Sequence, residues 1–254
     1  MLQVVFGELG RTARAKLFAY RHLFAIPALG VAAPFLFLRF GHIPRGGALE
    51  AMWNVAGLGA LLLGQGLRVW AAGYIGRTGR SKRLKAATLT TAGPYAHLRN
   101  PLYLGNFLLC LGVMFLTESY LLLLLCVVIF WALYLPVISV EEEFLQEQFG
   151  ADYLAYQQRV PRLIPRLTAA WKGQGTFQWK NLRKEYLSLA GVASAVLAVK
   201  AIDQPTYPLS FLAASGLLLL VPSLLERALK KARVSRSQLC RAAFQYTAGW
   251  QSSV

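Results

Sequence analysis

Long apolar runs alternate with short polar segments along most of the chain. We predict six of these runs as membrane-spanning helices, at residues 23–40, 49–75, 102–117, 120–138, 186–201 and 208–225. A helix needs about 20 apolar residues to cross a bilayer, so the third and fifth runs are short for a full crossing. Only Glu118 and Ser119 separate the third run from the fourth, which favours a tight helical hairpin. The pattern predicts an all-α, polytopic membrane bundle with about six transmembrane helices.

Glycines in the second run recur every seven residues, in two sets: Gly57 with Gly64, and Gly59 with Gly66 and Gly73. Small residues at this spacing let a neighbouring helix approach closely. The stretch Gly57-Leu58-Gly59 is the nearest match to the glycine-rich turn of nucleotide-binding proteins, but it lies inside an apolar run. We therefore interpret it as a packing feature.

The basic residues predict how the chain crosses the membrane. Of the 27 lysines and arginines, 23 lie in four segments, at residues 1–21, 76–101, 139–186 and 226–254. These segments fall on alternate connections, so the positive-inside rule places all four, and both termini, on the cytoplasmic side. We expect a bacterial inner membrane protein whose active site faces the cytoplasm. No signal-peptide cleavage site follows the first run, so we expect the N-terminus to be retained.

The composition supports a membrane protein and argues against two other classes. Hydrophobic residues make up 56% of the chain and charged residues 15%, against about a quarter in soluble domains. The net charge of +16 would suit nucleic acid, but the basic residues flank apolar runs and lack an aromatic RNA-binding motif. We expect anionic lipids as their partners, and no nucleic acid. Cys110, Cys126 and Cys240 lack metal-ligand spacing, so we expect no metal site and no disulfide.

The longest non-apolar stretch, residues 139–183, separates the fourth run from the fifth. In its first part, residues 140–159, aromatic side chains are mixed with acidic and amide residues. This pattern is typical of a helix at the membrane surface, where tyrosine rings are favoured.

A turn, an arginine and a helix start follow one another before the third run. Gly93-Pro94 is a turn signal, and Asn100 followed by Pro101 fits the N-cap and first position of a helix. The free N–H groups of such a helix start, together with Arg99, would suit a carboxylate or another anion.

Two tyrosines flank this helix start. The rings of Tyr95 and Tyr103 could stack on an adenine or pack near a sulfonium. An interfacial anchor of arginine and tyrosine would explain the same residues without a ligand.

Three acids, Glu141, Glu142 and Glu143, directly follow the fourth run. The C-terminal end of a helix disfavours negative charge, so we expect the basic segment 76–101 to compensate them. A solvated acidic cluster is the simpler interpretation. The functional one is that the acids bind ribose hydroxyls or a sulfonium cation.

Two further ionisable residues stand out. Arg68 lies inside the second run, where a charge marks either a functional site or a side chain that reaches out to the interface. His97 could act as a base, although an interfacial histidine is more often only hydrogen-bonded.

Together these residues resemble the signature of the isoprenylcysteine carboxyl methyltransferase and phospholipid methyltransferase superfamily. The pattern Arg-[His/Asn]-Pro-x-Tyr-x-Gly runs from Arg99 to Gly105, after the run from Leu89 to Tyr95, and a Glu-Glu pair follows one helical hairpin later. The closing pattern is present as Phe149, Gly150, Tyr153, Tyr156, Val160, Pro161, Ile164 and Pro165. The resemblance covers residues 49–166.

The resemblance implies a membrane methyltransferase that binds S-adenosylmethionine from the cytosol and methylates a lipophilic substrate arriving from the bilayer. The cofactor-binding residues that it implies are Thr88, Leu89, Tyr95, Asn100, Pro101, Leu102, Tyr103, Glu141 and Glu142. The candidate catalytic residues are Arg99, Glu142 and His97.

Two positions depart from the family pattern. Asn100 stands where a histidine is more familiar. Val137 stands where the prenylcysteine enzymes carry an arginine thought to hold the substrate carboxylate, so carboxyl methylation of a prenylated cysteine is not implied. The acceptor stays open among amine, thiol, hydroxyl and carboxylate.

We divide the chain into three parts: an N-terminal segment with the first helix (1–48), a methyltransferase core (49–166), and two further helices with a basic tail (167–254). Two alternative functions remain. Membrane sterol reductases share the Arg-x-Pro-x-Tyr-x-Gly and Phe-Gly-x-x-Tyr patterns but bind NADPH. A non-catalytic membrane scaffold could also retain the fold.

Overall fold

The computed structural model describes residues 47–75, 88–169, 171–173 and 175–203, and this part of the chain is helical, without a strand. In chain order the elements are α2 (Ala48–Tyr74), the 3-10 helix η2 (Gly93–Ala96), α3 (Pro101–Phe115), α4 (Tyr120–Phe149), α5 (Ala151–Arg159), the 3-10 helix η3 (Trp179–Lys184) and α6 (Glu185–Asp203).

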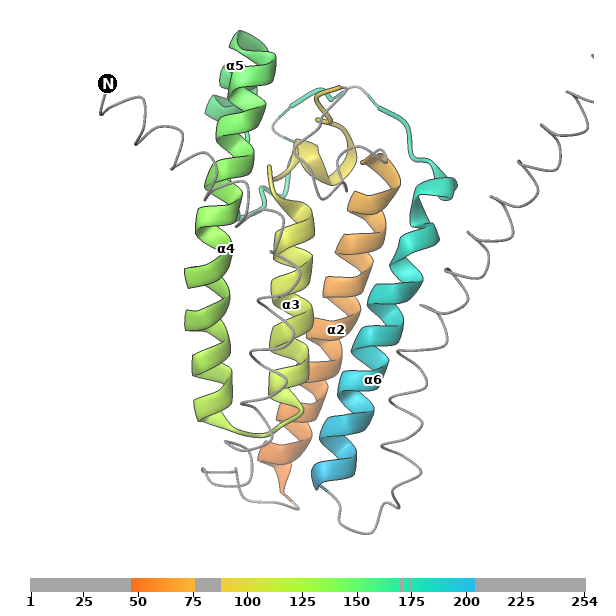
Figure 1. Ribbon diagram of the computed structural model, residues 1–254. Coiled ribbons are helices and arrows are strands. Elements are labelled where there is room, and N and C mark those ends of the chain that lie inside the picture. Colours follow the sequence, from red (N-terminus) through yellow and green to blue (C-terminus); the bar gives the residue numbers. More distant parts are fainter. Residues whose placement is uncertain (1–46, 76–87, 170, 174, 204–254) are drawn as a thin grey trace, which may run out of the picture.

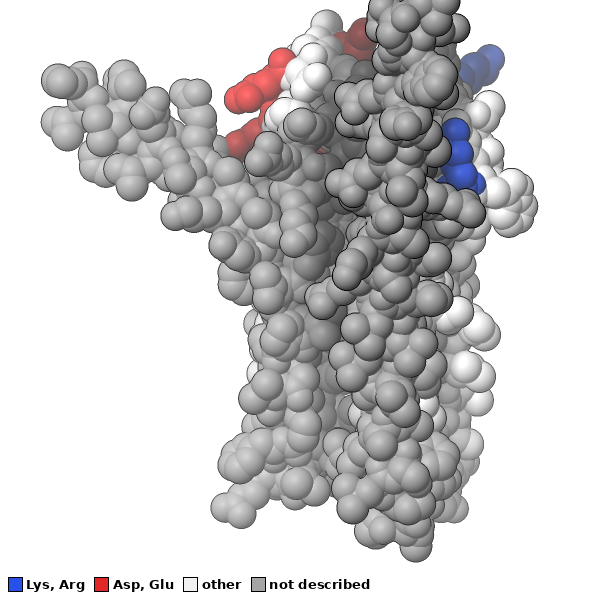
Figure 2. All heavy atoms as spheres, turned by 45° about the vertical axis from the view of Figure 1, so that its right-hand side comes forward, with Lys and Arg blue, Asp and Glu red and all other residues white. Residues whose placement is uncertain are grey.

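The four long helices, α2, α3, α4 and α6, run side by side with alternating direction (Figure 1). We call the end where α2 and α4 finish and α3 and α6 begin the upper end, and the opposite end the lower end. The short elements α5, η2 and η3 all lie at the upper end (Figure 1). On the face in Figure 2, the acidic and basic side chains of the described residues also gather near this end.

Glycines bring α2 and α3 into close contact. A Cβ atom at Gly57 would lie 3.0 Å from the carbonyl oxygen of Gly112, and one at Gly64 would lie 2.9 Å from that of Gly105. Paired small residues of this kind let two helix backbones approach. The prediction of a contact stripe is therefore confirmed for this set, with a matching pair on α3 that was not predicted.

The second glycine set behaves differently. Nothing lies within 4 Å of a Cβ atom placed at Gly59 or Gly66, so the predicted contact is wrong for these two. Residues 57 and 59 are separated by about 200° around a helix, and only one of the two faces points at α3. Gly73, at the end of α2, lies against the ring of Phe177.

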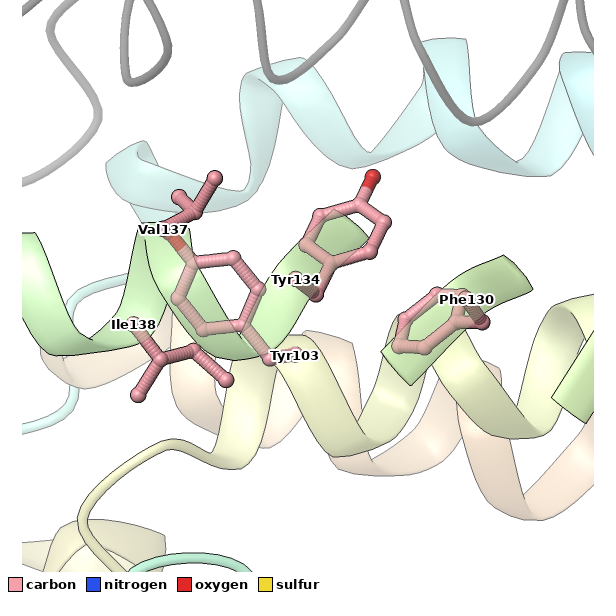
Figure 3. Close-up of a cluster of buried hydrophobic side chains, with 5 residues drawn as sticks. All are labelled: Tyr103, Phe130, Tyr134, Val137 and Ile138. Atoms are coloured by element: carbon pink, nitrogen blue, oxygen red, sulfur yellow. The ribbon is translucent and has the colours of Figure 1, made fainter. Parts of the chain in front are cut away.

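Aromatic and aliphatic side chains join α3 to the middle of α4. The buried cluster in Figure 3 consists of Tyr103, Phe130, Tyr134, Val137 and Ile138. The rings of Phe130 and Tyr134 stack with centroids 4.3 Å apart, and Tyr103 lies 5.6 Å from Tyr134. Val137 is 2% exposed in this cluster, in an apolar setting that suits its side chain.

The second to fifth apolar runs form α2, α3, α4 and α6. Of these, α2 and α4 are long and apolar enough to cross a membrane, and α3 is a shorter apolar helix. Both long helices expose large apolar side chains, among them Met52 and Leu124. The first and sixth predicted spans, residues 23–40 and 208–225, lie outside the described residues, as do the two termini and Cys240.

The stretch after the fourth run differs from the expectation. A separate surface helix was expected at residues 140–159, but α4 continues through the acidic triplet to Phe149. The chain breaks only at Gly150, whose φ of 52° is readily adopted by glycine, and α5 follows. The three acids are thus part of α4, and one of them, Glu142, is buried against neighbouring segments.

The lead-in to α6 crosses back over the end of α2. The backbone N–H of Gln178 and the side-chain amide of Asn181 both donate to the carbonyl oxygen of Gly73, at 2.9 and 3.2 Å. The ring of Phe177 lies 5.8 Å from that of Tyr74. Residues beyond the segment of family resemblance therefore pack directly on the bundle.

Candidate functional site

Glu142, in the last part of α4, connects three segments at the upper end. Its carboxylate accepts a hydrogen bond from Asn100 Nδ2 at 2.8 Å and forms ion pairs with Arg99 Nε at 3.3 Å and Arg162 Nε at 3.2 Å. The residue is only 8% exposed. A buried carboxylate is tolerated when ion pairs and hydrogen bonds replace its hydration. We call Glu142, Arg99, Asn100 and Arg162 the Glu142 cluster.

The start of α3 is built as expected in its backbone but not in its side chains. Pro101 is the first residue of α3 and Asn100 precedes it. The expected capping by the Asn100 side chain is wrong, because its amide makes no bond to the helix start and donates to Glu142. A hydrogen bond to a carboxylate is stronger than one between neutral groups. The anion beside this helix start is thus a glutamate of the same chain.

The acidic triplet divides into three environments. Glu142 is buried and paired, Glu143 is exposed, and Glu141 accepts a hydrogen bond from the Tyr103 hydroxyl at 2.8 Å. The expectation that the basic segment compensates the acids is confirmed for Arg99. A solvated cluster is excluded as the description of Glu142.

Arg162 is the member of the cluster that the sequence did not single out. It lies between Pro161 and Ile164 of the closing pattern, at a position that the pattern leaves open. One of its terminal amino groups, Nη2, donates to Ser139 Oγ at 2.6 Å, and its carbonyl oxygen accepts from Asn100. The available signal was an arginine that lies between the two prolines of the closing pattern.

Tyrosines of α5 extend the site on one side. Tyr153, Tyr156 and Val160 form a buried cluster against which Leu89 packs. The Tyr156 hydroxyl donates to the carbonyl oxygen of Tyr95 at 2.7 Å, which ties α5 to η2. Burial raises the pKa of both α5 tyrosines, so their hydroxyls stay protonated at neutral pH and can donate.

The other candidate residues are spread around this centre. Tyr95 is buried in η2. Leu102 is half-buried in the first turn of α3, and Thr88 is exposed.

His97 is half-buried and takes part in backbone pairing. Its Nδ1 lies 2.8 Å from the carbonyl oxygen of Arg166, whose N–H donates to the carbonyl oxygen of His97. The hydrogen-bonded interpretation of His97 therefore holds, and its role as a base stays a prediction.

Arg68 belongs to a separate cluster. Its guanidinium donates to Glu185, with Nε 3.2 Å from Oε2, and to the side chain of Asn106. Glu185 is the first residue of α6 and is buried. Arg68 thus joins α2 to α3 and to α6, which is a structural role and places no ligand.

Two of the buried donors at the centre have neither a hydrogen-bond acceptor nor an ion-pair contact among the described residues. They are Nη1 of Arg99 and the hydroxyl of Tyr153. Buried polar groups in proteins are paired in more than about 90% of cases, so unpaired ones call for an explanation. The donors, the rings of Tyr95 and Tyr103 and the carboxylate of Glu141 would together fit a ligand with an anionic group, an aromatic base and hydroxyls.

Comparison with known proteins identifies the family of the chain. Residues 52–152 match the phospholipid methyltransferase family. The cobalt-zinc-cadmium resistance protein CzcN of Cupriavidus metallidurans is 32% identical over 169 residues, 63% of this chain and 71% of that protein. The protein-S-isoprenylcysteine O-methyltransferase of Schizosaccharomyces pombe is 35% identical over 119 residues. The chain belongs to the isoprenylcysteine methyltransferase-like and phospholipid methyltransferase superfamily.

The coverage of these relatives is unequal. The aligned part is 45% of this chain and 50% of the S. pombe enzyme, so the chain spans about half of that enzyme's length. For the protein-S-isoprenylcysteine O-methyltransferase B of Arabidopsis thaliana, 30% identity extends over 123 residues, 46% of this chain and 62% of the plant protein. No solved structure matches the chain. Arg162 and α6 lie outside the family match.

Proposed function

We propose that this protein is an integral-membrane methyltransferase that uses S-adenosylmethionine to methylate a lipophilic acceptor. The observation that carries the proposal is the Glu142 cluster. It joins the first family pattern, through Arg99 and Asn100, to the Glu-Glu pair and to the closing pattern, through Arg162. Groups that are distant in the sequence thus meet at one end of the bundle.

The residues around the cluster fit the parts of S-adenosylmethionine. The unpaired Nη1 of Arg99 suits the carboxylate of the amino-acid end. The rings of Tyr95 and Tyr103 suit the adenine or the sulfonium, and Glu141 suits the ribose hydroxyls. The walls of this proposed cofactor pocket would be completed by Thr88, Leu89, Asn100, Pro101 and Leu102.

Glu142 takes a positioning role in this proposal. Both of its oxygens are already engaged by the cluster, so it holds Arg99 and Asn100 in place. The cofactor supplies a methyl group already activated by its sulfonium. The chain's residues then have to align donor and acceptor and exclude water, and no covalent intermediate on the protein is needed.

The acceptor is proposed to enter from the bilayer. The buried apolar cluster that contains Tyr103, Tyr134 and Val137 (Figure 3) is linked to Glu141 through the Tyr103 hydroxyl, so an apolar acceptor would reach the site from this side. Val137 carries no charge, so a carboxylate of the acceptor would find no cation at that position. The chemistry of the acceptor stays open.

The same proposal sets the orientation. The upper end carries the connections between predicted spans that are rich in lysine and arginine, so it would face the cytoplasm, where the cofactor is found. Contacts of these basic segments with anionic lipids would hold the site at the membrane surface. A bacterial inner membrane is the proposed location.

Binding of S-adenosylhomocysteine to the purified full-length chain in detergent tests the proposal. We expect a dissociation constant in the micromolar range, and a loss of about tenfold in Tyr103→Phe, since the hydroxyl that holds Glu141, the proposed partner of the ribose, is removed. The matched control is Glu143→Gln, an exposed neighbour that should bind like the unaltered chain. Binding of NADPH in place of S-adenosylhomocysteine would contradict the proposal.

A further inference from the structure

Tyr153 has a hydroxyl group that the fold itself does not use. The residue is 1% exposed in α5, and its hydroxyl has no hydrogen-bond partner in the described part of the chain. Its neighbour one turn later, Tyr156, has a hydroxyl that donates to the Tyr95 carbonyl oxygen at 2.7 Å. A phenylalanine would fill the same space as Tyr153 without the cost of burying an unpaired hydroxyl.

Arg99, a member of the Glu142 cluster, also has a buried donor without a partner among the described residues. Its side chain is 9% exposed, its Nε faces Glu142 at 3.3 Å, and its Nη1 is buried without a partner among the described residues. The backbone N–H of Arg99 donates to Pro161, directly after the Val160 that packs on Tyr153. This bond fixes the arginine beside the α5 cluster.

The two unpaired donors belong to one region. Tyr153 packs with Leu89, a residue of the predicted cofactor loop, and with Val160, whose neighbour Pro161 accepts the backbone hydrogen bond of Arg99. Burial raises the pKa of Tyr153, so its hydroxyl is a donor at neutral pH. The acceptors nearby are engaged, because Glu142 is bound by Arg99, Asn100 and Arg162 and Glu141 by Tyr103.

A guanidinium N–H and a phenol O–H that lack an acceptor together suit the two oxygens of a carboxylate. We infer that Tyr153 and Nη1 of Arg99 together bind a carboxylate group of a ligand. This inference rests on the proposed function, and it assigns the carboxylate to the amino-acid end of S-adenosylmethionine. The same chemistry would also accept a carboxylate on the lipophilic acceptor.

The test compares Tyr153→Phe with the unaltered full-length chain in detergent, using two nucleosides. S-adenosylhomocysteine carries the amino-acid end, and 5′-methylthioadenosine lacks it. We expect Tyr153→Phe to weaken S-adenosylhomocysteine binding by about tenfold and to change 5′-methylthioadenosine binding by less than about twofold. Only a group that contacts the amino-acid end produces this difference.

Tyr156→Phe is the matched control, since it removes a hydroxyl from the same helix that is already paired within the protein. It should lower the thermal unfolding midpoint and leave the ratio of the two nucleoside affinities unchanged. Tyr153→Phe should leave the midpoint unchanged or raise it, because no internal hydrogen bond is lost.

A second pair of probes separates the two sources of the carboxylate. Palmitate and hexadecanol differ in the carboxylate, so weaker binding of palmitate alone in Tyr153→Phe would assign the site to the acceptor and overturn the assignment to the cofactor. Equal losses for both nucleosides, or no change with any probe, would overturn the carboxylate site itself. If the unaltered chain binds neither nucleoside, the proposed function itself fails. This outcome is distinct from failure of the carboxylate site, which is seen only by comparing the variant with the unaltered chain.

Discussion

The two ends of the bundle each contain a buried glutamate, but the two differ in how completely the surrounding groups are paired. At the lower end, Glu118 accepts a hydrogen bond from Asn54 Nδ2 at 3.0 Å and lies 3.8 Å from Lys200 Nζ, which donates to Asn54 Oδ1 at 3.1 Å. These three residues, which we call the Glu118 cluster, join α2, the α3–α4 turn and α6. None of their side chains contains an unpaired buried polar atom among the described residues.

The Glu142 cluster at the upper end also joins three segments, but some of the buried hydrogen-bond donors in and beside it have no acceptor. Arg99 Nη1 and the nearby Tyr153 hydroxyl are buried without acceptors in the described part of the chain. A buried carboxylate alone therefore does not mark a functional site, since Glu118 is buried as deeply as Glu142. Unpaired donors beside the carboxylate distinguish a cluster that can bind a ligand from one that only holds helices together.

The backbone at Glu118 supports a structural role for the lower cluster. Glu118 has a φ of 57°, which is unusual for a residue with a side chain. Such a conformation costs on the order of 1–3 kcal/mol and persists where surrounding contacts hold it. Here the contacts with Asn54 and Lys200 fix the turn, and α3 and α4, the two helices that it joins, are set side by side.

Glu142→Gln should have the largest effect. It leaves the buried Arg99 and the half-buried Arg162 without a counter-charge, which costs about 3–5 kcal/mol of unfolding free energy in comparable buried pairs. We also expect S-adenosylhomocysteine affinity to fall by more than about a hundredfold, because Arg99 loses its orientation. Denaturant unfolding in detergent and calorimetric titration measure the two effects. Unchanged affinity would show that the cluster does not organise the site.

Glu118→Gln tests the lower cluster in the same way. We expect a loss of about 2 kcal/mol in unfolding free energy, less than for Glu142 because the Lys200 side chain is 35% exposed. The affinity of the folded protein for S-adenosylhomocysteine should stay within about twofold of that of the unaltered chain. A loss of affinity as large as that of Glu142→Gln would abolish the distinction between the two ends.

Tyr156→Phe and Tyr153→Phe sharpen the comparison within the upper end. Removing the Tyr156 hydroxyl breaks its buried hydrogen bond to the Tyr95 carbonyl oxygen and should cost about 1–2 kcal/mol of stability. Removing the Tyr153 hydroxyl should cost less than about 0.5 kcal/mol, since it breaks no internal bond. Equal losses in thermal unfolding would mean that the Tyr153 hydroxyl has an internal partner.

Lys200→Gln should have the smallest effect. A pair whose cation is one-third exposed contributes about 0–1 kcal/mol, and salt weakens it further. We therefore expect the unfolding free energies of Lys200→Gln and the unaltered chain to differ by less than about 1 kcal/mol. This difference should be smaller at high salt than at low salt. A larger, salt-independent loss would show that the Glu118 cluster is more strongly coupled than its geometry indicates.

The apolar pattern determined much of the fold without any tertiary information. Four of the predicted spans became α2, α3, α4 and α6, because long apolar runs form helices wherever they pack. Pro101 marked the first residue of α3, since proline fits a helix start and fits poorly within one. The acidic triplet and the arginine before Pro101 were also recognisable as partners, because opposite charges at one end of a hairpin attract.

Only the tertiary structure decided which groups meet. Asn100 lies 42 positions from Glu142, yet its Nδ2 donates to that carboxylate, and its side chain does not cap the helix start beside it. The pairing of Arg162 with Glu142, of Arg68 with Glu185 and of Lys200 with Glu118 follows from how the helices pack. A residue's own helix or strand preference is local, whereas a hydrogen-bond partner is set by the few groups that packing brings within reach. The sequence could therefore predict the helices and the segments that carry candidate site residues. It could not predict the side-chain pairs that make one end a candidate site and the other a structural cluster that holds the helices together.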